Sequence, residues 1–218
     1  MNLVMKTIAS FNDFVRRVFR KTITLPLSKS RLGYCGKHVN YQNTRPAPNR
    51  VMKCVYLCDN VTLNSTSFIM NGGKFIMKKN SGSSSDLTVI TGNHHRKLGV
   101  PFIAGRDLRI LDEEKDIVVE EDVWIGAGVT LLSGVTIGRG STVGAASTCL
   151  KSVPPYAVVM GNPAKVVGFN FTPEEIIEHE KALYPEEERL PLELLEKNYN
   201  KYFISRIKEI KEFTRLSL

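Results

Sequence analysis

Aliphatic residues recur at every sixth position over two stretches of the chain, a period that neither an α-helix nor an amphipathic strand has. In the more regular stretch these residues are Val119, Ile125, Leu131, Ile137 and Val143. A second series, four residues further on, is small or β-branched: Val123, Val129, Val135, Ser141 and Ser147. Very short strands broken by regular turns produce such a period, because one residue per segment points inward and another must let the chain bend. The pattern predicts an all-β solenoid whose stacked units share one aliphatic column.

The same period extends upstream, although less regularly. It runs through Leu57, Leu63, Ile69, Phe75 and Leu87, with Ser81 out of character. The two repeat blocks, about 55–92 and 118–153, are separated by a charged excursion over about 95–117 that has no hexad. A long excursion from a solenoid is more often functional than accidental. We therefore expect a solenoid domain over 55–168 with substrate contacts in this loop.

The segment 1–54 is basic and contains an amphipathic helix. Residues 1–53 hold 11 Lys and Arg against Asp13 alone, while the whole chain has a net charge of +8. An apolar stripe at helical spacing lies opposite a basic face; the stripe is Phe11, Phe14, Val15, Val18 and Phe19, and the basic residues are Arg16, Arg17, Arg20 and Lys21. We expect this helix to cap the open end of the solenoid. The alternative is peripheral contact with an anionic membrane, and nucleic acid is disfavoured because no nucleic-acid-binding motif accompanies the charge.

The C-terminal segment 169–218 changes to helical periodicity. Thr172 is the expected N-cap, Pro173 the first helical residue and Glu175 the partner in a capping box. This helix should end at Pro185, and a second should run from after Pro191 through Ile210. We expect both to brace the solenoid and assign them no chemistry.

Composition predicts a soluble chain. No apolar run approaches the ~20 residues of a membrane span, and the N-terminus lacks the pattern of a secretory signal, so we expect a cytoplasmic protein. The four cysteines form no paired framework and no C-x-x-C, which disfavours both a disulfide scaffold and a zinc site. Cys149 falls on an inward hexad position, where it should act as a small core residue.

Histidine is the side chain best matched to removing a proton near neutral pH. The chain has His38, His94, His95 and His179. His94 and His95 stand where the first repeat block gives way to the excursion, at an edge that substrate can reach. The pair alone would favour two surface histidines beside a loop.

The hexads, "TGNHH", "DVWIGAGV" and "VPPYAVVMGNPAKVVG" together resemble the hexapeptide-repeat acyltransferases, and most of all the sugar O-acetyltransferases similar to galactoside and maltose acetyltransferases. The resemblance covers about residues 55–168. It implies a left-handed parallel β-helix, with helical caps at both ends in this chain. It also implies a homotrimer with active sites between subunits, and acetyl-CoA as co-substrate.

The resemblance also assigns roles to residues. His94, which follows the "TGN" turn, matches the family's general base, and the Ala127 amide matches its oxyanion donor. Trp124 matches the family's tryptophan, although a corner-filling aromatic is an equal alternative. The pantetheine arm would run against the Ala145 amide, with Lys151 and Lys165 near the phosphates. Leu150 and Gly168 depart from the threonine and arginine of some relatives, which puts the coenzyme affinity in question.

The acceptor is the least determined part. Asn93, His95, Arg106 and Arg109 are the candidates for contacts to it, and the mixed charges of the loop, which include Asp107, suit a polyhydroxylated sugar better than an acyl chain. We therefore expect an acetyl-CoA-dependent O-acetyltransferase acting on a saccharide, a surface-polysaccharide precursor being the favoured choice. The alternatives are N-acetylation of an aminosugar and a non-catalytic scaffold. A metal hydratase on the same solenoid would need three converging histidines, so no metal is expected.

Overall fold

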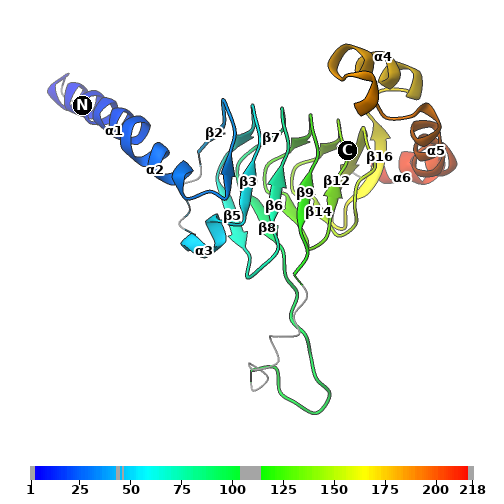
Figure 1. Ribbon diagram of the computed structural model, residues 1–218, viewed down its shortest axis with the longest axis horizontal. Helices are drawn as coiled ribbons and strands as arrows, with labels where there is room; N and C mark the ends of the chain where they lie inside the picture. Colours follow the sequence, from blue (N-terminus) through cyan, green and yellow to red (C-terminus); the bar gives the residue numbers. More distant parts are fainter. Residues whose placement is uncertain (1–2, 43–44, 46, 104–113, 216–218) are drawn as a thin grey trace.

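The chain forms a parallel β-solenoid with helices at both ends of the sequence (Figure 1). The computed structural model describes residues 3–42, 45, 47–103 and 114–215. The N-terminal elements are α1 (Leu3–Phe19), the π-helical turn η1 (Arg20–Thr24), α2 (Leu25–Ser30), β1 (Tyr34–Cys35), β2 (Asn40–Tyr41) and α3 (Asn49–Met52). The first repeat block holds β3 (Val55–Leu57), β4 (Thr62–Leu63), β5 (Thr66–Ile69), β6 (Phe75–Met77), β7 (Gly82–Ser83) and β8 (Leu87–Ile90).

The second repeat block continues the same sheets. Its strands are β9 (Ile117–Val119), β10 (Trp124–Ile125), β11 (Thr130–Leu131), β12 (Thr136–Ile137), β13 (Thr142–Val143) and β14 (Thr148–Cys149). They are followed by β15 (Ala157–Met160), β16 (Lys165–Phe169), α4 (Pro173–Leu183), η3 (Glu186–Glu188), α5 (Leu192–Tyr202), η4 (Ile204–Arg206) and α6 (Ile207–Arg215). Among the described helices, none has the length and apolar character needed to cross a membrane.

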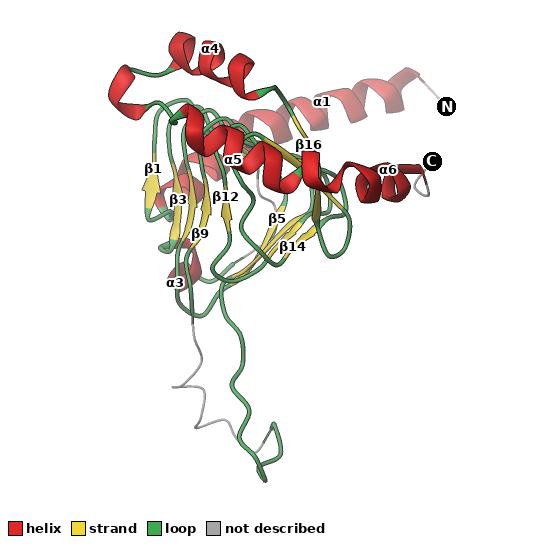
Figure 2. Ribbon diagram, turned by 90° about the vertical axis from the view of Figure 1, so that its right-hand side faces the viewer, coloured by secondary structure: helices red, strands yellow, loops and turns green. Residues whose placement is uncertain are grey.

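The strands build three sheets, which the chain visits in turn. Their orders are β1-β3-β6-β9-β12, β16-β15-β13-β10-β7-β4-β2 and β14-β11-β8-β5. Pairing between successive coils is parallel, and only the final β15–β16 pair of the described strands is antiparallel. In the second block one coil takes 18 residues, since Trp124 pairs with Thr142. This arrangement confirms the predicted solenoid of hexads (Figure 2).

The interior is the aliphatic column that the hexads predict. All five aliphatic residues of the second block, from Val119 to Val143, are fully buried, and so are their partners from Val123 to Ser147. The two serines of this series are hydrogen-bonded: the Ser141 hydroxyl donates to the Pro154 carbonyl at 2.9 Å, and the Ser147 hydroxyl accepts from the Gly161 N–H at 3.0 Å. Both hydroxyls reach backbone groups at a corner of the coil.

In the first block the predicted series is wrong at Ile69. Its side chain is 57% exposed, whereas Phe68, paired with Val89, packs against the core. The corner between β5 and β6 is longer than a hexad allows, so Phe75 pairs with Val55 and not with Leu57. Leu57 and Leu63 therefore belong to one series of inward-facing residues, whereas Phe75 and Leu87 belong to the second series, which includes Val55. The stacking also begins earlier than residue 55, because β1 pairs with β3 and β2 with β4.

The N-terminal helix does not pack over the end of the solenoid as expected. Every described side chain of α1 is exposed, and the helix projects away from the coils (Figure 1). At the other end of the chain the capping box of Thr172 and Glu175 is confirmed. The expected second helix is broken at Phe203, which separates α5 from η4 and α6.

A buried carboxylate joins the C-terminal helices to the last coils. Glu180 of α4 is fully buried and accepts hydrogen bonds from the Tyr156 hydroxyl at 2.9 Å and the Leu190 N–H at 2.7 Å. Its Oε2 also lies 3.2 Å from Arg139 Nη1. Arg139 in turn contacts Glu121 at 3.2 Å and lies over the ring of Tyr184. One side chain therefore ties the helix, the following loop and two coils together.

We expect Glu180→Ala to lower the free energy of unfolding by about 3 kcal/mol, because it leaves buried donors without their acceptor. Urea unfolding followed by circular dichroism measures the change. Glu178→Ala is the matched control, since Glu178 is exposed on the same helix and should matter by less than about 0.5 kcal/mol. Equal stability of the two variants would show that Glu180 does not hold the helices in place.

Candidate active site

Ala127 and Ala145 occupy the same corner of two successive coils. They follow β10 and β13, whose residues Ile125 and Val143 pair with each other. Both alanines are exposed, and neither N–H donates a hydrogen bond within the described part of the chain. The Ala127 carbonyl accepts from the Ala146 N–H at 2.8 Å, which fixes the spacing of the two corners. The corner thus presents two amide donors to a ligand, one coil apart.

Two glycines set the surroundings of this corner. A Cβ on Gly126 would lie 2.6 Å from the Ala145 nitrogen, so a side chain there would displace the amide. A Cβ on Gly82 would lie 3.1 Å from Cζ3 of Trp124, whose ring therefore covers that glycine. Trp124 is 51% exposed and does not fill a corner of the core. Its ring belongs to the outer surface beside the Ala127 corner.

His94 lies just beyond β8, at the base of the excursion. The Asn93 side-chain oxygen accepts the His94 backbone N–H at 3.0 Å, and the His94 ring meets the edge of Phe102 with 5.8 Å between centroids. Arg96 lies over the same phenyl ring at 5.6 Å. His94, His95 and Asn93 are all exposed. The sequence thus places an accessible imidazole at the predicted edge, oriented by an aromatic side chain from the loop.

The two ends of the excursion are held together at the coil. Gly92 and Glu114 form an antiparallel bridge, and the Thr91 hydroxyl oxygen lies 2.7 Å from Glu114 Oε2. The Lys115 N–H donates to the Thr91 carbonyl at 3.0 Å. The loop therefore starts and ends at one fixed point two residues from His94. Arg106, Asp107 and Arg109 lie outside the described residues.

One chain does not bring the predicted groups together. Ala127 lies at the corner between the seven-stranded and four-stranded sheets, whereas His94 lies past the end of a strand in the four-stranded sheet. These are different corners of the coil. A base and an oxyanion donor must both reach one reacting carbonyl. The described part of one chain therefore does not place His94 and Ala127 at the same corner.

The lysines predicted near the coenzyme are exposed. Lys151 follows β14, and Lys165 opens β16 with its Nζ 3.6 Å from Glu209 Oε1 of α6. Leu150 and Gly168 are the two positions at which the sequence is expected to differ from some relatives. Leu150 is 51% exposed, and a Cβ on Gly168 would meet nothing within 4 Å.

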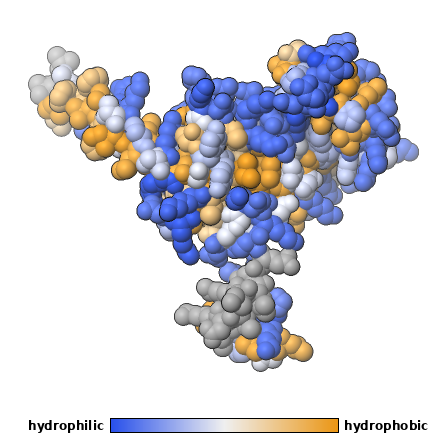
Figure 3. Space-filling view, viewed as in Figure 1, coloured by the Kyte–Doolittle hydropathy of each residue, from blue (hydrophilic) through white to orange (hydrophobic). Residues whose placement is uncertain are grey.

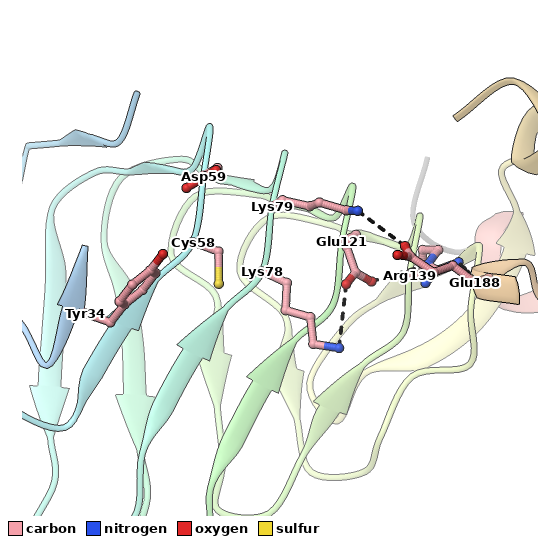
Figure 4. Close-up of a pocket in the computed structure, with 8 residues that line it drawn as sticks. All are labelled: Tyr34, Cys58, Asp59, Lys78, Lys79, Glu121, Arg139 and Glu188. Carbon is pink, nitrogen blue, oxygen red and sulfur yellow. Dashed lines mark hydrogen bonds and ion pairs between the residues drawn. The ribbon is translucent and has the colours of Figure 1, made fainter. Parts of the chain in front are cut away.

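A cavity lined by charged side chains lies elsewhere on the coil. It has a volume of about 480 Å³ and lies where the strands β3, β6, β9 and β12 end (Figure 4). Its lining consists of Tyr34, Cys58, Asp59, Lys78, Lys79, Glu121, Arg139 and Glu188. None of the residues predicted to carry chemistry borders it. Sequence reasoning missed this cluster because its members come from successive coils, so that Lys78 and Glu121 are neighbours in space but far apart in sequence.

Most charges of this cavity are paired. Lys78 Nζ lies 3.6 Å from Glu121 Oε1, and also 2.6 Å from Oε2 of Glu120, which does not line the cavity. Lys79 Nζ lies 3.4 Å from Glu188 Oε2. Burial lowers the pKa of Lys78, but the hydrogen bond and charge of Glu120 outweigh it and raise that pKa overall. Burial raises the pKa of Glu121, but its backbone hydrogen bond and the charges of Lys78 and Arg139 lower it overall. The cluster is a structural ion-pair network, and we assign it no ligand.

Comparison with known proteins identifies the repeat. Residues 116–151 match the bacterial transferase hexapeptide family, in the form of six repeats. The resemblance drawn from the sequence is confirmed for this segment. No curated protein matches the sequence. Among the described residues, no group of three or more His, Cys, Asp and Glu side chains gathers in a way that could hold a metal ion.

Solved structures share the fold. A hexapeptide-repeat acetyltransferase from Vibrio cholerae O1 biovar eltor, in complex with acetyl-CoA, is 24% identical, with a TM-score of 0.55 over 66% of this chain and 75% of that one. A maltose O-acetyltransferase from Clostridium difficile 630 is 19% identical, with a TM-score of 0.53 over 77% and 89%. A galactoside acetyltransferase in complex with coenzyme A is 20% identical, with a TM-score of 0.52 over 76% of each chain.

Cys149 is confirmed as a core residue. It is 1% exposed, and burial raises the pKa of its thiol to about 11. A thiol with such a pKa forms almost no thiolate at neutral pH and is a poor nucleophile.

We expect iodoacetamide at neutral pH to leave Cys149 of the native protein unmodified, because the thiol is both buried and protonated. Peptide mass spectrometry after a short exposure identifies the modified thiols, with the half-buried Cys54 as the internal comparison. Cys149→Ala should lower the free energy of unfolding by about 1 kcal/mol. Rapid alkylation of Cys149 under folding conditions would refute its burial.

Proposed function

We propose that this protein transfers an acetyl group from acetyl-CoA to a hydroxyl of a saccharide. The observation that carries the proposal is the transferase hexapeptide repeat of residues 116–151, preceded by an exposed His94 at the end of the first repeat block. The fold shared with the maltose O-acetyltransferase and the galactoside acetyltransferase supports the proposal. The same likeness supports a left-handed coil.

In the proposed reaction the acceptor oxygen attacks the thioester carbonyl directly. His94 takes the hydroxyl proton as the carbon–oxygen bond forms. The Ala127 N–H donates to the carbonyl oxygen as negative charge develops there, an interaction that contributes a few kcal/mol in acyl transfer. The carbon–sulfur bond then breaks, and the leaving thiolate takes a proton from the imidazolium. Cys149 takes no part, because its thiol is buried and protonated.

The coenzyme would lie along the outer surface of the later coils. The unpaired amide of Ala145 suits an amide of the pantetheine arm, and Trp124 offers an aromatic face beside it. Lys151 and Lys165 are exposed cations suited to the phosphates. The pairing of Lys165 with Glu209 and the absence of a side chain at Gly168 both predict modest coenzyme affinity.

We propose a homotrimer in which each site lies between two chains. The support is geometric: His94 and Ala127 lie on different corners of one coil, and the cavity at the ends of β3, β6, β9 and β12 borders neither of them. A neighbouring subunit would supply the second wall. A cytoplasmic location, where acetyl-CoA is made, stays a prediction.

Acceptor contacts are proposed for the base of the excursion and the loop itself. Asn93, His95, Arg106 and Arg109 are the candidates, and a surface-polysaccharide precursor is the favoured substrate. The polar lining supports a sugar with several hydroxyls. An amine in place of the hydroxyl would require an aminosugar acceptor and the same base.

The experiment that tests the proposal is a panel of free sugars, nucleotide sugars and aminosugars incubated with acetyl-CoA and scored by thiol release. We expect release with one or more saccharides carrying a free hydroxyl, and mass spectrometry of the product to show an ester. An amide product would assign N-acetylation. Release with none of them, together with no binding of coenzyme A by calorimetry, would favour a non-catalytic scaffold.

On the best acceptor, we expect His94→Ala to lower kcat by about 10³-fold or more and to leave coenzyme A affinity near the wild-type value, because the imidazole acts on the acceptor proton. Steady-state kinetics and calorimetry measure the two effects. His95→Ala is the comparison variant: as a proposed acceptor contact it should raise the KM of the acceptor and keep kcat within about tenfold of wild type. The reverse order of the two variants would move the base to His95.

A further inference from the structure

The N-terminal arm of the chain, residues 3–30, stands apart from the coils (Figure 1). It is one continuous helical rod, in which η1 links α1 to α2. Two of its few contacts with the coil region are Arg20 Nη2 to Gln42 Oε1 at 3.3 Å and Lys29 Nζ to the Val39 carbonyl. Both contacts come from its second half. The proposed acyl transfer gives this arm no role.

One face of α1 is a continuous apolar surface. Its members are Met5, Ile8, Phe11, Phe14, Val15, Val18 and Phe19, each between 44% and 67% exposed. They recur at spacings of three and four residues, so a helix brings them to one side. Figure 3 shows the apolar side chains gathered along the projecting helix. Exposing this much apolar side chain is costly in water, so the face is expected to be covered by something.

The opposite face is basic. Over residues 3–30 the sequence has Lys6, Arg16, Arg17, Arg20, Lys21 and Lys29 against Asp13, a net charge of +5. Arg16 stands three residues from Phe19, and Arg17 three residues from Phe14, so cations border the apolar face on both sides. Such side chains can extend outward while their stems cover apolar surface. This is the arrangement of a helix that lies in the plane of a lipid interface.

We infer that the arm docks on the surface of a bilayer containing anionic phospholipids, with α1 parallel to the membrane. The apolar face enters the boundary between headgroups and acyl chains, and the flanking guanidinium groups contact lipid phosphates. Charge selects this occupant over a second copy of the chain, because a helix packed on protein needs no cations on both borders of its apolar face. Acceptors carried at a membrane would then be brought near the coils, although the docking does not depend on what the protein acetylates.

The test uses the full-length protein and co-sedimentation with vesicles. We expect binding to vesicles of phosphatidylcholine mixed with phosphatidylglycerol, little binding to phosphatidylcholine alone, and release at high salt. Phe11→Ala combined with Phe14→Ala should reduce partitioning by about tenfold or more, since it removes two anchors while keeping good helix formers. Arg16→Gln combined with Arg17→Gln should reduce it by roughly fivefold for each charge.

The matched control is Lys208→Gln combined with Lys211→Gln, which removes the same charge from exposed positions of α6. It should bind as the wild type does. Equal losses for the control and the arginine variant would reduce the effect to net charge and overturn the inference. Failure of the wild type to bind anionic vesicles would also overturn it. Sedimentation velocity tests whether a second copy of the chain covers the apolar face. If the phenylalanine variant changes the oligomeric state and the arginine variant does not, the apolar face contacts a second copy and not lipid, which would overturn the inference.

Discussion

The inward column of aliphatic side chains is the constraint on which the rest of the structure depends. A strand of two or three residues buries almost nothing alone, so each coil is stable only when the next one stacks on it. The stacking fixes the register, as the pairing of Ile125 with Val143 and of Leu131 with Cys149 shows. The first and the last coil each have one side with no further coil stacked on it. At the C-terminal end, the buried carboxylate of Glu180 attaches helix α4 and the following loop to the last coils.

The regular part of the fold could be predicted because the constraint acts on individual residues. Five aliphatics at a six-residue step are enough to indicate coils, and Cys149 follows the same step into the core. Ile69 could not be placed this way, because a longer corner before Phe75 changes which residue faces inward. The break at Phe203 was equally invisible, since α5 and α6 continue the same apolar spacing. Periodicity predicts what repeats and fails where the repeat is interrupted.

The candidate site also contains some residues that the sequence could predict and others that it could not. Ala127 and Ala145 are selected by the resemblance of their motifs and not by the hexads, and the structure places both at one corner of successive coils. Their roles stay predictions. The outward position of Trp124 could not be predicted. The ion-pair cluster of Lys78, Glu121 and Arg139 could not be predicted either, because it joins different coils, and the excursion separates Lys78 from the other two residues in sequence. The buried contacts of Glu180 had one indication in the sequence, because Glu180 is an acidic residue at an apolar position of α4. A carboxylate at such a position requires buried donors, and the sequence does not say which residues supply them.

The corners offer backbone donors that suit the long anionic coenzyme of the proposed reaction without dedicated side chains. The N–H groups of strand residues donate hydrogen bonds to the neighbouring coil, whereas the turn N–H groups of Ala127 and Ala145 have no acceptor among the described residues. Because the coil repeats every 18 residues, these donors recur at a fixed spacing along one edge. The donors are therefore a consequence of the stacking and carry little specificity of their own. In the reaction proposed above, specificity therefore comes from residues that the hexads do not fix: His94 and the excursion are the proposed determinants for the acceptor, and the basic arm is the proposed determinant of location.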